Sequence, residues 1–351
     1  MWPVAPAKLD SVIFTAARHA STDPTEGPLV AEATALTPEA RRLDRDLTKA
    51  AVSAEMVSAM QKKASDHLGQ MERTAADLKK CDVGSFANAS DVAPVSAASF
   101  HAASDTELFV CPPARLAFVH IFKCAGTTVI ASMHDLCRAT YGVDGFCVTA
   151  GAPWVCRGGP TRTMEEEWPN LQQYAWFTFV RDPVSKFESG VFELARRGAP
   201  CVLDAGANRE GDELALNVLE SCVLSKDRRE EVDPHLRPSI NYLLEPAMTV
   251  SPLLSHVGRV EAFVDDWPAL VTNFFDATKG AQVRELLLNN SLHERDSNED
   301  AYAADAPEKF NLQIASKRAR STVEQAFHAD EVCLGYARRP QEKFRCVLDG
   351  C

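Results

Sequence analysis

The spacing of apolar residues predicts one long helix near the N-terminus. Thr37 and Pro38 make a good start, because a hydroxyl can cap the first turn and proline fits the first helical position. From there to residue 80, apolar residues recur in alternating steps of four and three, which is the seam of a heptad repeat. Two interpretations stay open: a stalk that self-associates as a coiled coil, or a helix packed on the main domain. The seam consists of Leu43, Leu47, Ala50, Ala54, Val57, Gln61, Ala64, Leu68, Met71, Ala75 and Leu78.

Two continuous apolar runs predict buried strands. The runs are LAFVHI at 116–121 and YAWFTFV at 174–180. Unbroken apolar runs are typical of parallel strands covered on both faces, and a helical pattern follows each run. We therefore expect an α/β fold, with a parallel sheet and crossover helices preceded by the long N-terminal helix. Further helices are expected at 211–225, 239–246, 266–288 and 316–329.

The composition along the chain divides it into four parts. These are an irregular segment at 1–36, the helix at 37–80, an Ala-, Ser- and Asp-rich linker at 81–110, and the main domain at 111–351. We find no run of the roughly 18 apolar residues that a membrane-spanning helix needs. The expectation is either a soluble chain or one whose anchor precedes this sequence.

Charge and cysteine content narrow the possible partners and compartments. The net charge of -12 argues against a nucleic-acid partner, so an anionic ligand would need a local basic pocket. The eleven cysteines include no CxxC pair, and no metal site is expected. Two interpretations of these cysteines stay open: disulfides formed in an oxidising lumen, or scattered buried thiols. Sequons at Asn88 and Asn289 predict glycosylation.

The first motif, KCAGTT, lies between the first apolar strand and the helix after it. Its backbone N–H groups can face an anion, and the start of the helix adds partial positive charge. Gly126 lets a ligand approach the backbone, and Lys123 adds a full charge. The lysine precedes the glycine, so this is not a Walker A loop, and a plain link with a solvated lysine is the alternative. The motif consists of Lys123, Cys124, Ala125, Gly126, Thr127 and Thr128.

The second motif begins where the second apolar strand ends, at Arg181. Asp182 can cap the next helix, and the proline after it fits the first helical position. Arg181 and Ser189 could together hold one phosphate. The buried stripe of this helix is expected at Val184, Phe187, Val191 and Leu194, and the opposite face carries Lys186, Ser189 and Glu193.

Together these motifs resemble the Golgi-type, membrane-bound carbohydrate sulfotransferases. The family's H-I-P-K-x-[AG]-[GS]-[ST] is similar to residues 120–127, with Phe122 in place of proline. Its F-x-x-x-R-D-P-x-x-[RK]-x-x-S is similar to 177–189, with Lys186 for the commoner arginine. Three weaker matches follow, to D-x-H-x-x-P, G-[KR]-x-E and D-x-x-x-[LF]-x-Y. They fall at residues 233–238, 258–261 and 330–336, and the resemblance extends over about 115–336.

The resemblance implies a P-loop NTPase-like sulfotransferase fold and a specific reaction. The sulfuryl donor would be 3′-phosphoadenosine 5′-phosphosulfate (PAPS), and the acceptor a hydroxyl of a glycan or glycoconjugate. The family binds the 5′-phosphosulfate at the first motif and the 3′-phosphate at the second, here Arg181 and Ser189. It acts in the Golgi lumen in association with the membrane, and no metal is required.

The chemistry of sulfuryl transfer assigns roles to two residues. Lys123 would stabilise the leaving phosphate, because the reaction depends on positioning and on charge at the leaving oxygen. His235 is the candidate general base, since histidine titrates near working pH. Its alternative is a structural role in the turn, and the further candidates for the base are Glu261, His120 and His134.

Two other classes of function stay open. A nucleotide kinase or NTPase would need a Walker A lysine and an acidic strand end for magnesium, and the sequence offers neither. A non-catalytic coiled-coil scaffold with an inactive sulfotransferase-like domain would not need Lys123, Arg181 and Ser189, which are all present.

Overall fold

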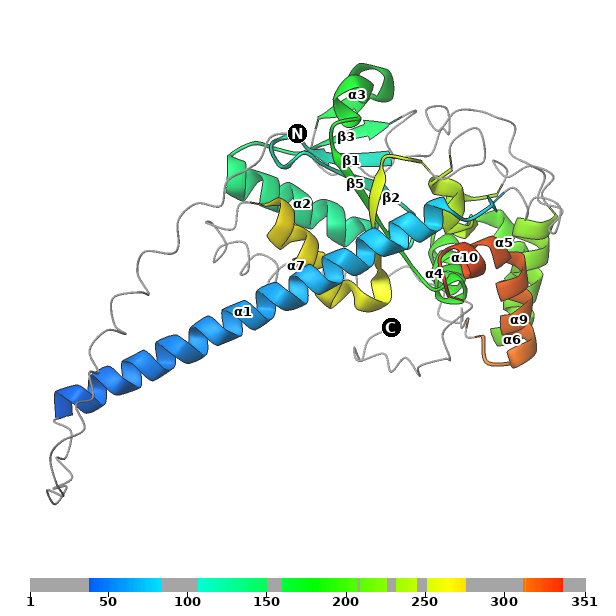
Figure 1. Ribbon diagram of the computed structural model, residues 1–351. Coiled ribbons are helices and arrows are strands. Elements are labelled where there is room, and N and C mark those ends of the chain that lie inside the picture. The colour runs from blue at the N-terminus through cyan, green and yellow to red at the C-terminus, as the bar shows by residue number, and fades with distance from the viewer. Residues whose placement is uncertain are drawn as a thin grey trace, which may run out of the picture. The chain divides into compact units, whose positions relative to one another are not determined.

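The protein is an α/β molecule built on a mixed sheet of six strands, in the order β4-β3-β1-β2-β5-β6 (Figure 1). The computed structural model describes residues 38–83, 107–149, 160–206, 209–225, 232–244, 251–275, 312 and 314–336. It divides into two compact units, 1–56 and 57–351. The strands are β1 (Glu107–Cys111), β2 (Leu116–His120), β3 (Phe146–Thr149), β4 (Thr161–Thr163), β5 (Ala175–Val180) and β6 (Leu254–Arg259).

The expected wholly parallel sheet is wrong, because β1 runs antiparallel to both of its neighbours, β2 and β3. Strands β2, β5 and β6 are parallel, as are β3 and β4. A single 3-10 turn, η2 (Pro112–Ala114), joins β1 to β2, and Arg115 closes it with a φ of 49°. A connection of four residues can turn a hairpin but cannot hold a crossover helix, so β1 must be antiparallel to β2. Strand β1 also begins within the range expected to be a linker.

The helices of the structure fall mostly where helical spacing predicts them. The expected helix at 239–246 is instead a short 3-10 turn, η6. The longer helices are α1 (Pro38–Lys79), α2 (Gly126–Tyr141), α3 (Met164–Leu171), α4 (Pro183–Arg196), α5 (Pro200–Gly206), α6 (Gly211–Val218), α7 (Phe263–Phe274), α9 (Lys317–Ala326) and α10 (His328–Cys333). The shorter turns are the π-helical η3 (Leu219–Leu224) and the 3-10 turns η5 (Pro234–Leu236), η6 (Ser239–Tyr242) and η7 (Val260–Ala262).

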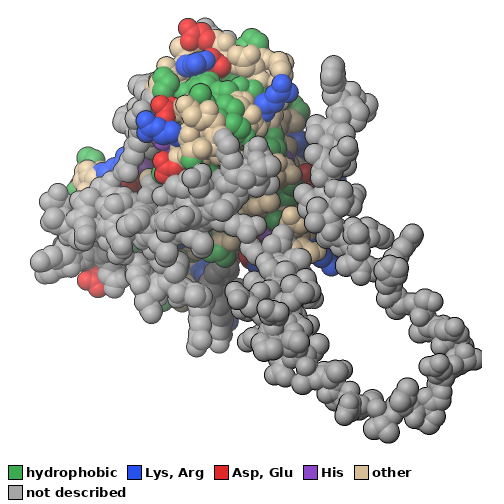
Figure 2. All heavy atoms as spheres, turned by 90° about the vertical axis from the view of Figure 1, so that its left-hand side faces the viewer, with side chains coloured by type: hydrophobic (Ala, Val, Ile, Leu, Met, Phe, Trp, Pro, Cys, Tyr) green, Lys and Arg blue, Asp and Glu red, His purple; other side chains and the backbone are tan. Residues whose placement is uncertain are grey.

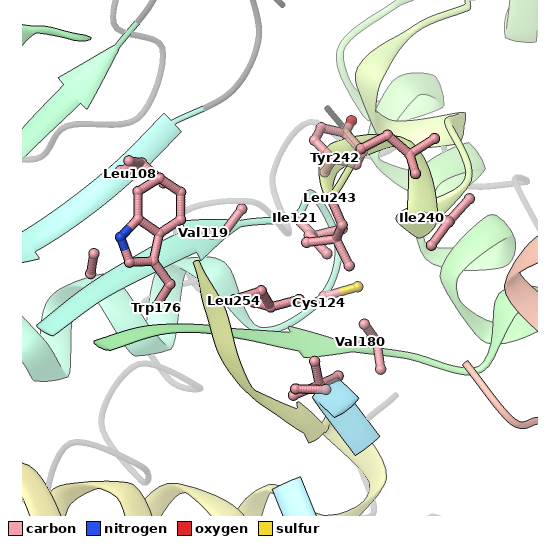
Figure 3. Close-up of a cluster of buried hydrophobic side chains, with 14 of the residues drawn as sticks. Leu108, Val119, Ile121, Cys124, Trp176, Val180, Ile240, Tyr242, Leu243 and Leu254 are labelled. Atoms are coloured by element: carbon pink, nitrogen blue, oxygen red, sulfur yellow. The ribbon is translucent and has the colours of Figure 1, made fainter. Parts of the chain in front are cut away.

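Side chains on the two faces of the sheet belong to different cores. Leu116 and Phe118 of β2 lie on the face that α2 and α7 cover (Figure 1). Val119 lies on the opposite face with Trp176, in the cluster shown in Figure 3. A third cluster joins α4, α5, α6 and α9, which gather beyond one end of the sheet. The predicted buried stripe of α4 is confirmed, since all four of its residues lie in this third cluster.

The last turns of α1 pack on the sheet. Met71 belongs to the core beside α2, whereas Ala75 and Leu78 belong to the core on the other face. Gln61, the polar residue of the predicted seam, is exposed. The packed-helix interpretation therefore holds for these last turns, and the side chains of 38–57 lie outside the described residues.

Three disulfides occur in the part of the chain that the structure describes. They join Cys81 to Cys333, Cys111 to Cys137 and Cys201 to Cys222. The first ties the end of α1 to α10, across 252 residues of chain. On the face shown in Figure 2, acidic and basic side chains of the described residues lie interspersed rather than in separate patches.

Candidate functional site

The two motifs meet at one edge of the sheet. Strands β2 and β5 are parallel neighbours, with Leu116 opposite Ala175 and Phe118 opposite Phe177. Their carboxyl ends therefore lie side by side. The loop after β2 carries the first motif and the loop after β5 carries Arg181, so both motifs belong to the same edge. Ligands of open α/β sheets commonly bind at this edge.

The loop between β2 and α2 has a backbone shape suited to an anion. Lys123 has a φ of 65° and Ala125 a φ of 60°, a region that costs a non-glycine residue about 1–2 kcal/mol. Alternation of left-handed and other residues turns successive N–H groups toward one concave side. Between them, Cys124 anchors the loop, because its buried side chain points into the core beside Val180 and Ile240 (Figure 3).

Gly126 has a further role that the sequence does not suggest. A Cβ atom at this position would overlap the ring of His120. That ring is held by Glu107, whose carboxylate oxygen lies 3.1 Å from His120 Nδ1, and both side chains are buried. The glycine therefore makes room for a histidine of the protein itself, at the first residue of α2.

Lys123 points toward the last turns of α4. Its Nζ lies 3.7 Å from Glu193 Oε2, and Glu193 Oε1 accepts hydrogen bonds of 2.6 Å from both Arg196 and Arg197. Burial lowers the pKa of Lys123, and the charges of Arg181, Arg197 and Arg196 lower it further. Glu193 opposes this shift. The structure thus gathers three cations around one carboxylate, and Arg181 lies close enough to act on the lysine.

The same cations act on Glu193. Burial would raise the pKa of this carboxyl group, but its bonds to the two arginines and the charge of Lys123 outweigh that effect. The result is a pKa of about 2. Glu193 therefore stays ionised at any physiological pH, and the cluster keeps an excess of positive charge that a phosphate or sulfate could balance.

The residues that the helical wheel places opposite the buried stripe of α4 have different surroundings. Ser189 is half-buried, one turn before Glu193 on the same face. Lys186, by contrast, is fully buried and donates a hydrogen bond to the backbone oxygen of Arg237. It is shielded from solvent, because η5 and the residues after it cover that part of α4. Burial lowers the pKa of Lys186.

His235 lies on η5, beside the first loop. Its Nδ1 lies 2.7 Å from Asp233 Oδ1, and its ring centroid is 4.8 Å from that of Phe122. Because a carboxylate can only accept, Nδ1 carries the proton and the neutral ring keeps its lone pair on Nε2. The hydrogen bonds from His235 outweigh burial and lower the pKa of Asp233, as does the charge of Arg197. The ring itself is buried.

The other candidates for a general base have different surroundings. Glu261 accepts hydrogen bonds from the backbone of Asp182 at 2.7 Å and from the Tyr336 hydroxyl at 3.1 Å, so it holds the start of α4 in place. His134 lies within α2, 3.6 Å from Asp144, which follows the end of that helix. The ring of His120 pairs with Glu107. Each of these side chains thus has a partner within the protein.

Sequence reasoning missed the contribution of Arg196 and Arg197. Both follow Glu193 at helical spacings of three and four, on the side of α4 that carries Ser189. That spacing is the signal that could have found them. The resulting arrangement can bind an anion at Lys123 and place a histidine–carboxylate pair beside it.

Neither a metal centre nor a membrane span is found among the residues described. No three His, Cys, Asp or Glu side chains there are placed to hold a metal ion. No helix in those ranges is long and apolar enough to cross a membrane. Comparison with known proteins found no matching family model, no similar curated protein and no similar solved structure.

Proposed function

We propose that this protein is a PAPS-dependent sulfotransferase with a P-loop NTPase-like fold, acting on a hydroxyl of a glycan. One observation carries the proposal: the left-handed loop with Lys123 and the strand end with Arg181 adjoin at one edge of the sheet. One bisphosphorylated nucleotide could span both. The excess of cations around Glu193 supports a polyanionic ligand in a chain whose net charge is -12.

The proposed roles follow from the charges. The backbone from Lys123 to Thr128 receives the 5′-phosphosulfate, and Arg181 with Ser189 receives the 3′-phosphate. During transfer the acceptor oxygen bonds to sulfur while the bond from sulfur to the 5′-phosphate oxygen breaks. Lys123 balances the charge that grows on that oxygen. His235, oriented by Asp233, takes the proton of the acceptor hydroxyl.

Donor binding is the first test. Arg181→Ala should weaken 3′,5′-adenosine bisphosphate by about 2 kcal/mol, the size of a lost charge-assisted pair, measured by calorimetry. Binding of adenosine 5′-phosphosulfate, which lacks the 3′-phosphate, should stay nearly unchanged. Arg162→Ala is the matched control, because Arg162 pairs with Glu167 at 2.6 Å on a different part of the sheet. Equal loss of both nucleotides would show that Arg181 supports the fold and not a phosphate.

Turnover is the second test. With labelled PAPS and a panel of glycans, His235→Ala should lower the rate by roughly a hundredfold while donor affinity stays the same. Lys123→Ala should lower turnover more than ground-state affinity, because its charge matters most as the leaving phosphate forms. Near-normal turnover of His235→Ala would return this residue to a structural role. Retention of the wild type on ATP resin alone would favour a kinase or NTPase instead.

The proposed compartment is the Golgi lumen, with the protein associated with the membrane. Three disulfides support an oxidising compartment. Alkylation of freshly isolated, denatured protein should leave their six cysteines unmodified until a reductant is added. Immediate modification of all eleven thiols would contradict a luminal location.

A further inference from the structure

We infer that Glu193 is a positioning residue for the transfer: its carboxylate gathers Lys123, Arg196 and Arg197 about one point and holds the lysine ready as a cation. The inference rests on the proposed function, in which Lys123 stabilises the leaving phosphate. Glu193 would touch neither the donor nor the acceptor. It would act through the three cations.

The geometry divides the two oxygens of Glu193 between two tasks. Oε1 takes the two arginines, with Arg196 Nη2 and Arg197 Nε each at 2.6 Å. Oε2 lies 3.7 Å from Lys123 Nζ and 3.3 Å from Arg196 Nε. The carboxylate is only 12% exposed and the lysine side chain 24%. This shielded arrangement differs from the exposed surface pairs that contribute little.

The lysine depends on this one carboxylate. Three positive groups act on Lys123 from two elements: Arg181 from the end of β5, with Arg196 and Arg197 from the end of α4. All three oppose its positive charge, and so does burial. Among the described groups, Glu193 exerts the largest charge effect on Lys123, and that effect favours the ammonium. Asp233, the other nearby carboxylate, acts on Arg197 and pairs with His235.

Loss of the charge on Glu193 should therefore have two opposite effects. In Glu193→Gln the lysine should lose its proton at a lower pH than in the wild type, because the carboxylate that favours the ammonium is gone. The pH at which activity falls on the alkaline side of the profile should shift downward by the same amount. At neutral pH, however, the site has gained one net positive charge, so 3′,5′-adenosine bisphosphate should bind roughly threefold to tenfold more tightly. A merely structural role would weaken both binding and turnover.

Two measurements test this on the full chain. The first is the pH dependence of Lys123 modification by an amine-reactive reagent, followed by mass spectrometry of the Lys123 peptide. The second is the pH profile of sulfuryl transfer, beside the affinity for 3′,5′-adenosine bisphosphate. Glu213→Gln is the matched control, because Glu213 forms an exposed pair with Arg209 on α6 at 3.2 Å. Glu193→Asp keeps the charge and should retain most of the wild-type midpoint. Glu193→Ala, which also removes the charge, replaces Glu193→Gln should that variant fail to fold.

The outcomes separate this inference from the proposed function. A lower Lys123 midpoint in Glu193→Gln, with a matching shift of the activity limb and none in Glu213→Gln, supports the inference. An unchanged midpoint overturns it, as does a shifted midpoint with an unmoved activity limb. If the wild type binds no 3′,5′-adenosine bisphosphate, the proposed function falls and with it the role in transfer. The labelling midpoint then still decides whether Glu193 keeps Lys123 charged.

Discussion

Gly190 in α4 offers a quantitative test of how tightly this helix holds η5. A Cβ atom there would overlap the backbone oxygen of His235 and lie 3.1 Å from its carbonyl carbon and 3.0 Å from Leu236 Cδ2. The oxygen belongs to the backbone and cannot rotate away as a side chain could. In Gly190→Ala, η5 must therefore move by roughly 1 Å to regain ordinary contact distances.

The cost can be worked out from two opposing effects. Overpacking a tight contact costs about 1–3 kcal/mol. Alanine instead of glycine inside a helix returns about 0.5–1 kcal/mol. We expect Gly190→Ala to lower the free energy of unfolding by about 1 kcal/mol, the difference between the middle values of these two ranges.

The assay is denaturant unfolding with the disulfides intact, followed by tryptophan fluorescence. Gly69→Ala in α1 is the matched control, because its nearest atom is Arg73 Nη1 at 3.4 Å, the end of a flexible side chain. That variant should be as stable as the wild type or slightly more stable. Hydrogen exchange of residues 232–238 should become faster in Gly190→Ala alone. A Gly190→Ala variant at least as stable as the wild type would refute the close contact between α4 and η5.

Three further predictions concern α10 and its neighbours. The buried carboxylate of Asp330 accepts two backbone hydrogen bonds from η6, at 2.6 and 2.8 Å. Asp330→Ala should therefore lower the free energy of unfolding in urea by about 2–4 kcal/mol. An unchanged urea midpoint would contradict this contribution of the two hydrogen bonds. Burial and neighbouring carboxylates raise the pKa of Glu331 to about 7, so its folded form binds a proton more tightly than the unfolded chain and stability falls as pH rises through 7. Glu331→Gln should therefore melt higher than the wild type at pH 8 and equally at pH 4.5, whereas equal melting at both would exclude this effect. Replacing Cys81 and Cys333 by serine should cost about 2–5 kcal/mol, because their disulfide closes a very long loop; a melting temperature equal to that of the wild type would argue against that contribution.

Much of the local structure could be read from the sequence because local structure has a period. The apolar runs at 116–121 and 174–180 are buried strands, since a strand covered on both faces needs no polar residue. The stripe of α4 is buried because its residues recur at helical spacing. The loop from Lys123 to Gly126 also followed from the sequence, as a short link between a strand and a helix start.

The sequence could not specify which elements become neighbours. Strand β1 pairs with β2 and β3, and only those pairings make the sheet mixed. A helical wheel gives the direction of each side chain but not what covers it. For that reason Lys186 and Ser189, on the same side of α4, have different surroundings: η5 covers the lysine and leaves the serine half-buried.

The candidate site shows the same division. Lys123 and Arg181 were identified from their motifs, because each follows a buried strand. Their meeting at one edge required β2 and β5 to be adjacent, which is a fact of the sheet. The approach of Lys123 to Glu193 joins residues 70 positions apart in the chain. The local sequence pattern determined which strand or helix each residue belongs to. Tertiary packing decided which charges act on one another, because electrostatic interactions depend on distance in space and not along the chain.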